Sequence, residues 1–292
     1  MSGMGLKAGL ALLAVSTAIN AAPATAEGRT LAPAGEWQVE RSDESCRLRR
    51  DTAVAFSLYA YGPDGYSLAV LNGASLPRNS GRARVREVAF GVEGAPEEVI
   101  VVDNSSGGEG MVSFHLLGAN PALSYFRGWE VLGGFETSQP AVPQPSDMSV
   151  LRIGGGEMEP ITLLLGDMAE PMADLDDCKA ALTESWGYDE DMLGQVAEPP
   201  VLENRANIIN KMKMPEAAVM NHVTMIAQMR VAVDENGAAS DCTVQYPSLS
   251  TRAQRGLCGP LLQGQPFAPA RNALGQAVPG LFRMQYTYFI FN

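Results

Sequence analysis

The sequence predicts an α+β protein with a β-rich N-terminal domain and a small ββαβ C-terminal domain. Two observations lead to this fold class, and a third concerns export. Short runs that alternate between apolar and polar residues follow one another through the chain. Apolar residues at helical spacing occur in few places. The chain begins with an apolar segment followed by small residues, which is typical of an exported protein.

The first 26 residues have the features of a cleaved signal peptide. Lys7 supplies a positive start, residues 8–19 form an apolar core, and residues 24–26 (ATA) form a small-residue cleavage site before Glu27. An uncleaved anchor is the alternative, but this core is shorter than the roughly 20 apolar residues that cross a bilayer. We therefore expect a periplasmic protein with no membrane span once the signal is removed.

The N-terminal domain is expected over residues 27–188, as a small sandwich or a barrel-like sheet with one helix. Its expected strands are FSLYAY (56–61), YSLAVL (66–71), VREVAF (85–90), EEVIVVD (97–103), MVSFHLL (111–117), MSVLRI (148–153) and EPITLLL (159–165). The glycines at 154–156 predict a hairpin turn between the last two. A helix is expected over residues 172–186, because apolar residues recur there on one helical face, and Gly187 ends it.

Residues 189–213 are expected to be a connector, because they hold a Pro-Pro pair and a polar helical run. The C-terminal domain follows over residues 214–292. Its first strand is the alternating run MIAQMRVAV (225–233), and a second alternating run stops at Pro247.

Turn and cap residues connect the elements of this domain. The segment DENG (234–237) suits a tight hairpin between the first two strands. Thr251 and Gln254 have capping-box spacing, which predicts a short helix that ends near Gly259. A last strand is expected over residues 281–291. Its inward residues would be Phe282, Met284, Tyr286, Tyr288 and Ile290, and its outward residues Arg283, Gln285 and Thr287.

The C-terminal segment carries a recognisable series of motifs. The D-x-x-G hairpin at 234–237 is followed by a strand, a helix, the motif F-x-P-A-R at 267–271, a G-x-x-V turn at 275–278 and the last strand. This order resembles the C-terminal domain of TonB-like energy transducers. The resemblance implies that the last strand lies at a sheet edge, where an extended peptide adds by main-chain hydrogen bonds. Arg283, Gln285 and Thr287 are then the candidate partner-binding residues.

The resemblance also implies a partner and a disulfide. The partner would be a protein or extended peptide of the cell envelope, and an outer-membrane transport receptor is the candidate. One cysteine in the second strand and one in the helix, Cys242 and Cys258, match a common variant of the family. Cys46 and Cys178 remain for a second bridge, which would tie the first strand of the N-terminal domain to its helix.

Searches for catalytic, metal and cofactor motifs find none, so we expect neither an enzyme nor a cofactor. His115 lies in an apolar strand-like run, His222 precedes a strand, and neither has zinc-ligand spacing with the cysteines. Residues 27–213 carry 15 basic and 29 acidic residues, a net charge of −14, whereas five basic and four acidic residues follow Met214. This charge argues against nucleic-acid binding.

The sequence therefore favours an exported binding or adaptor protein. A membrane anchor and a long proline-rich span, which energy transduction requires, are not expected after signal removal. Two alternatives stay open: a periplasmic enzyme with an unrecognised site in the N-terminal β domain, and a structural envelope protein that self-associates through sheet edges. A homodimer is also possible.

Overall fold

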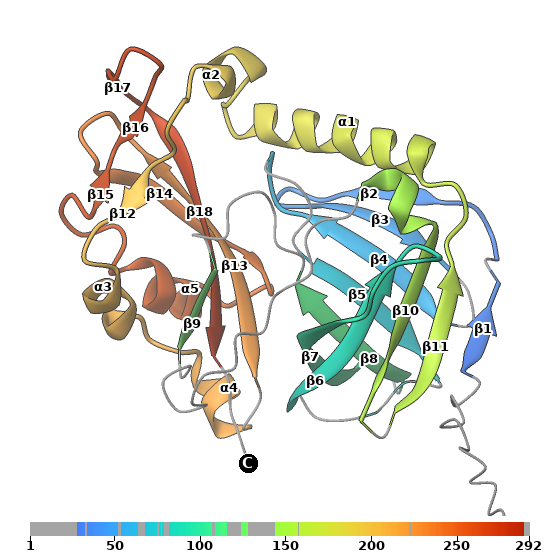
Figure 1. Cartoon of the computed structure of the whole chain (residues 1–292). Coiled ribbons are helices and arrows are strands. Elements are labelled where there is room, and N and C mark those ends of the chain that lie inside the picture. Colours follow the sequence, from blue (N-terminus) through green and yellow to red (C-terminus); the bar gives the residue numbers. More distant parts are fainter. Residues whose placement is uncertain are drawn as a thin grey trace, which may run out of the picture.

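The fold is described from a computed structural model of the whole chain (Figure 1). The structure describes residues 28–32, 34–51, 54–63, 68–74, 76, 78, 82–106, 109–115, 124–127, 144–156, 158–221 and 224–288. For residues 68, 82, 83, 100, 104–106, 115, 124–127, 287 and 288 it describes the backbone alone. The expected signal peptide, the expected mature start at Glu27 and the side chain of Ile290 lie outside the described residues.

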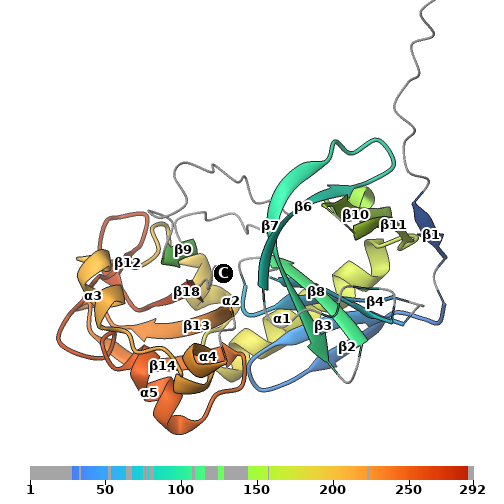
Figure 2. The ribbon, with the colours of Figure 1, turned by 90° about the horizontal axis from the view of Figure 1, so that it is seen from below.

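The N-terminal domain is built on one curled sheet of ten strands, which Figures 1 and 2 show from the side and from below. In spatial order the strands are β1 (Arg29–Leu31), β11 (Met158–Leu164), β10 (Val150–Gly155), β6 (Arg82–Phe90), β7 (Glu97–Ser106), β8 (Glu109–His115), β5 (Leu68–Gly73), β4 (Ala55–Ala60), β3 (Cys46–Arg50) and β2 (Gln38–Arg41). All neighbours are antiparallel except β1 and β11. The sheet curls into a half-barrel, so the barrel-like form of the expected domain is the one observed, and the sandwich is not.

Each run of residues that was expected to be a strand overlaps one of these strands. The alternation also identified the side that packs inward, because the core gathers every second residue of the strands. Its fully buried members include Leu48, Phe56, Leu58, Leu71, Val101, Val112, Phe114, Leu151, Ile153 and Leu163. The hairpin at the glycines is present as well, with Gly155 and Gly156 at φ of 96° and 62°.

One long helix completes this core. Helix α1 (Ala169–Ser185) packs on β2 and β3, and the 3-10 helix η3 (Pro145–Ser149) lies at its side. Met172, Leu175 and Leu182 of α1 are buried in the core. The helix ends where the sequence predicted, because Gly187 adopts a φ of 86°.

The C-terminal domain contains a four-stranded sheet. Its strands, in spatial order, are β14 (Ala239–Tyr246), β13 (Met225–Val233), β18 (Gly280–Tyr288) and β9 (Ser124–Arg127). Strand β13 is antiparallel to β14 and β18, whereas β9 runs parallel to β18. Helix α5 (Thr251–Cys258) packs on β14. The described part is thus broadly α+β, with strands in the majority.

Local chemistry explains the hairpin and the helix start. The Asp234 carboxylate accepts hydrogen bonds from the N–H groups of Asn236 and Ala238 at 2.9 and 2.8 Å. Gly237 has a φ of 81°, and a Cβ there would lie 2.0 Å from the Phe267 carbonyl oxygen, so the turn requires glycine. The expected capping box was one residue late, because Ser250 is the N-cap and its hydroxyl accepts from the Ala253 N–H at 3.4 Å.

The expected connector is partly built into the C-terminal domain. It contains α2 (Glu190–Gly194), β12 (Val201–Leu202) and α3 (Arg205–Lys211). Strand β12 pairs with β15 (Phe267–Ala268), and Ile209 and Met212 are buried in the C-terminal core. Helix α4 (Glu216–Met220) follows, and β16 (Ala270–Arg271) pairs with β17 (Ala277–Val278). A two-residue strand shows no repeat, which is why the sequence pattern did not reveal this packing.

Candidate binding surfaces of the C-terminal domain

Two of the residues expected to point outward from the last strand, Gln285 and Arg283, are buried and half-buried. Gln285 is buried, and its Oε1 accepts a hydrogen bond from Gln228 Nε2 of β13 at 3.2 Å. Arg283 is half-buried, and its guanidinium lies against Gly62 of the N-terminal domain. Thr287 pairs through its backbone with Ile226, and its side chain lies outside the described residues. The sequence correctly separated the two faces of β18, but the outer face, which carries Arg283 and Gln285, covers another domain instead of meeting water.

The edge of β18 is also occupied over part of its length. Strand β9, from the N-terminal part of the chain, pairs with residues 285–288 of β18 in parallel register. The expectation of a free last-strand edge was therefore wrong for this half of the strand. The reason is a long-range pairing, because β9 comes from a distant part of the sequence. Within the described residues, no strand pairs with Gly280–Met284 of β18 on that side.

A charged contact joins the outer face of the C-terminal sheet to the N-terminal domain. Arg230 Nη2 of β13 lies 3.4 Å from each carboxylate oxygen of Glu44, in the turn between β2 and β3. The guanidinium also lies 4.4 Å from the centre of the Trp186 ring at the end of α1. Arg230 also forms an ion pair with Asp241 of β14, whose Oδ2 lies 3.5 Å from Arg230 Nη1. The sequence contains no signal for these partners of Arg230, because Glu44 and Trp186 are distant from it in the chain.

Tyrosines extend the same interface. The Tyr61 ring lies 6.0 Å from Tyr59 and 6.1 Å from Tyr246 of β14, centre to centre. Burial raises the pKa of Tyr61 well above its ordinary value of 10.0, and Tyr246 and Tyr59 raise it further. A register shift between β13 and β14 at Gln228 and Met229 places Tyr246 opposite Gln228, on the side of the sheet where Tyr61 lies.

All four cysteines form disulfides. Cys46 bonds Cys178 and ties β3 to α1, and Cys242 bonds Cys258 and ties β14 to α5. These are the pairs expected from the sequence. The Cys46–Cys178 bond holds the elements that carry Glu44 and Trp186, so it orders the surface that receives Arg230. Two disulfides are compatible with an exported protein. Among the described helices, none has both the length and the apolar character that a membrane crossing requires.

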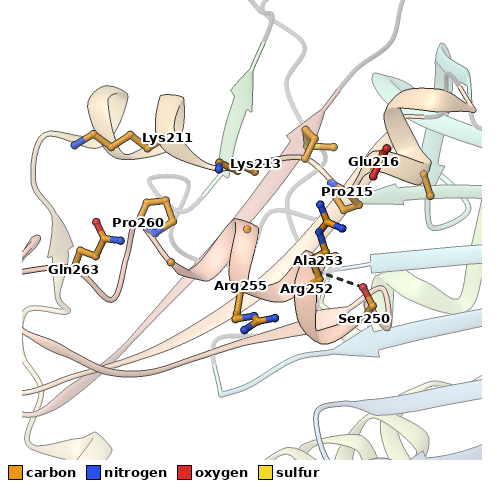
Figure 3. Close-up of a pocket in the computed structure, with 14 residues that line it drawn as sticks. Lys211, Lys213, Pro215, Glu216, Ser250, Arg252, Ala253, Arg255, Pro260 and Gln263 are labelled. Atoms are coloured by element: carbon orange, nitrogen blue, oxygen red, sulfur yellow. Dashed lines mark hydrogen bonds between the residues drawn. The ribbon is translucent and has the colours of Figure 1, made fainter.

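A basic cleft lies beside α5 in the C-terminal domain (Figure 3). It has a volume of about 690 Å³ between the α3–α4 segment and α5. Lys211 and Lys213 come from the first wall, and Arg252 and Arg255 from the second. All four side chains are exposed. The sequence alone does not bring these residues together, because the two walls are distant in sequence.

Other charged groups have structural explanations. Arg86 Nη2 donates to the buried Asp103 at 2.7 Å and Nη1 donates to the Gly155 carbonyl at 2.6 Å, which joins β6, β7 and β10 inside the N-terminal domain. Within the described residues, no group of three or more His, Cys, Asp or Glu residues is placed to hold a metal ion. The side chains of His115 and His222 lie outside those residues.

Comparison with models of known families, with curated proteins and with solved structures gave no match. The likeness of residues 214–292 to TonB-like domains therefore stays a prediction from their motifs.

Proposed function

We propose that the protein is an exported, periplasmic adaptor that binds an extended segment of another envelope protein by strand addition to β18. The observation that carries the proposal is the β9–β18 pair. This edge forms a parallel ladder with a segment that is not its hairpin neighbour, so its backbone is suited to accept a strand from elsewhere. Such binding rests on main-chain hydrogen bonds, and the side chains set the register.

The other edge of the sheet is less suited to the same task. Strand β14 has register shifts opposite Gln228–Met229 and Ala232–Val233 of β13. Irregular edges of this kind twist away from a potential partner and protect a sheet against unwanted pairing. The disulfide from Cys242 also holds β14 to α5. These features favour β18 as the docking edge.

The interface between the two domains favours an adaptor over an energy transducer. A transducer module must reach its receptor at a distance, whereas Arg230 and Tyr246 of this C-terminal domain contact Glu44 and Tyr61 of the N-terminal domain. An outer-membrane transport receptor is the candidate partner that the sequence resemblance implies. In this proposal, β9 is a resident strand that the partner displaces or extends.

Proline substitutions in β9 test this mechanism. Successive amides of a strand point to opposite sides, so either Tyr125→Pro or Phe126→Pro removes an amide that faces β18. We expect one of the two to raise the affinity of the mature protein for labelled receptor-derived peptides about tenfold, because it weakens the competing strand. Tyr125→Ala and Phe126→Ala keep both amides and should change the affinity less than about threefold.

A substitution in β18 itself is a poor test. Gln285→Pro would disrupt a strand that has neighbours on both sides, and Gln285 is buried against Gln228. The β9 variants avoid this difficulty. Failure of every receptor-derived peptide to bind the wild type and both proline variants would refute strand addition.

A further inference from the structure

The basic cleft has a charge arrangement that the strand-addition proposal does not use. Among the residues that line it, Lys211, Lys213, Arg252 and Arg255 carry positive charge, and Glu216 carries the one negative charge. Within the described part of the chain, none of the four cations forms an ion pair. The whole chain has a net charge of −12, so a concentration of basic side chains in one cleft is unexpected from composition alone.

The two walls are fixed close together by the backbone. The N–H of Lys213 donates to the Gly256 carbonyl of α5 at 2.9 Å. A Cβ on Gly256 would lie 3.0 Å from the Lys213 carbonyl oxygen, so this close approach favours glycine. Met212 and Leu257 are buried directly beside these residues in the C-terminal core. The two walls that carry the cations are therefore held close together.

The arginine and lysine side chains that carry these charges are suited to binding phosphate groups. Arg252 and Arg255 are three positions apart on α5 and lie on neighbouring parts of the helix surface. Planar guanidinium groups donate pairs of hydrogen bonds to phosphate oxygens, and lysines add compact positive charges. A cleft lined by one sign of charge also concentrates counter-ions. A phosphate group places nearly two negative charges and several acceptor oxygens at one point, which a single carboxylate does not.

We propose that the basic cleft binds a phosphate group, carried by a small molecule or by a lipid headgroup. The site is independent of β18, because its walls are α5 and the segment from α3 to α4 (Figure 3). Within the described residues the four cations form no ion pair, so an anion that enters the cleft does not have to displace a carboxylate from them.

Calorimetric titration of the mature protein with pyrophosphate and with inorganic phosphate at low salt tests the proposal. We expect saturable binding of pyrophosphate that weakens as salt is added. The double variant Arg252→Gln/Arg255→Gln should lose at least tenfold in affinity, and Lys211→Gln/Lys213→Gln should lose at least threefold. Arg84→Gln is the matched control, because Arg84 is an exposed arginine on β6 outside the cleft, and it should bind like the wild type.

A second measurement separates the two sources of phosphate. Co-sedimentation with vesicles that contain a phosphatidic-acid fraction, reversed by pyrophosphate, assigns the site to a lipid headgroup. Retained pyrophosphate binding without co-sedimentation assigns it to a soluble phosphate compound. The proposal is overturned if pyrophosphate does not bind, if Arg84→Gln weakens binding as much as the cleft variants, or if an acidic peptide binds the cleft and pyrophosphate does not compete with it.

Discussion

The two large sheets of the molecule differ in how many faces of their strands are buried. The N-terminal sheet packs one face on its core and leaves residues such as Val85 and Leu164 of the other face exposed, at 45% and 38% of their surface. The central strand of the C-terminal sheet, β13, is covered on both faces, and every one of its residues except Ile226 is buried. Both sheets come from alternating sequences. Alternation therefore identifies two faces of a strand, but it does not distinguish a face in water from a face against polar groups of another domain.

The largest expected effect tests whether the N-terminal domain loses more stability than the C-terminal domain when each loses its disulfide. Cys46→Ser/Cys178→Ser opens a loop with a sequence separation of 132. The chain-entropy estimate for such a loop is about 5 kcal/mol of unfolding free energy, against about 3 kcal/mol for Cys242→Ser/Cys258→Ser. Denaturant unfolding followed by tryptophan fluorescence measures the stability of the N-terminal domain, because all three tryptophans precede residue 189. The prediction would be contradicted if both double variants lost the same unfolding free energy as measured by tryptophan fluorescence.

A core substitution should affect the C-terminal domain alone. Leu257 of α5 is fully buried among C-terminal residues, so Leu257→Ala should lower the unfolding free energy of this domain by about 3 kcal/mol. Hydrogen exchange at the amides of β13 and β18 measures the loss. Leu274→Ala is the control, because Leu274 is 82% exposed and its removal should leave exchange unchanged. Equal acceleration in the strands of the N-terminal sheet would mean that the two domains unfold together.

The interface itself is tested by Arg230. We expect Arg230→Ala to cost about 2 kcal/mol, since it removes the contacts with Glu44 and the Trp186 ring and leaves the half-buried Glu44 without its cation. The emission of Trp186 should change, because its ring loses the guanidinium above it. Arg230→Lys keeps the charge and should lose less. An unchanged emission spectrum and stability in Arg230→Ala would show that this contact does not join the domains.

The smallest expected effect at neutral pH is that of Tyr61. Its folded pKa lies well above the ordinary 10.0 because it is buried, so its neutral form is the one that folding favours. The stabilising contribution is complete below pH 10.0 and is lost as the pH rises toward the folded pKa. We expect the free energy of unfolding to fall above about pH 10, and to fall less in Tyr61→Phe. Denaturant titrations of both proteins between about pH 8 and about pH 11 measure the difference.

Local chemistry in the sequence predicted the parts of the fold that depend on neighbouring residues. The Asp234–Gly237 hairpin and the helix end at Gly187 follow from hydrogen bonding and from positive φ, which glycine adopts at low cost. The face of β18 that builds the core, with Phe282, Met284 and Tyr286, follows from alternation. Each of these features is contained within a few positions of the chain.

Features that join distant segments were not predicted. Strand β9 has four residues, so no repeat marks it, and its pairing with β18 depends on the course of the whole chain. The contact between Glu44 and Arg230 and the backbone hydrogen bond from Lys213 to Gly256 beside the basic cleft arise from packing of separate elements. A single sequence shows which residues are charged and on which face they lie, but it does not show which of them become neighbours.

The Cys46–Cys178 disulfide makes a covalent ring from the part of the chain that holds strands β3 to β11. A protease that cuts once between these two cysteines opens the ring without releasing a fragment. The cut protein keeps its mass, apart from one added water, and migrates as two pieces only after reduction. Strand β9 lies inside this ring, so a single cut on either side of it would leave β9 attached to the molecule and close to the edge of β18.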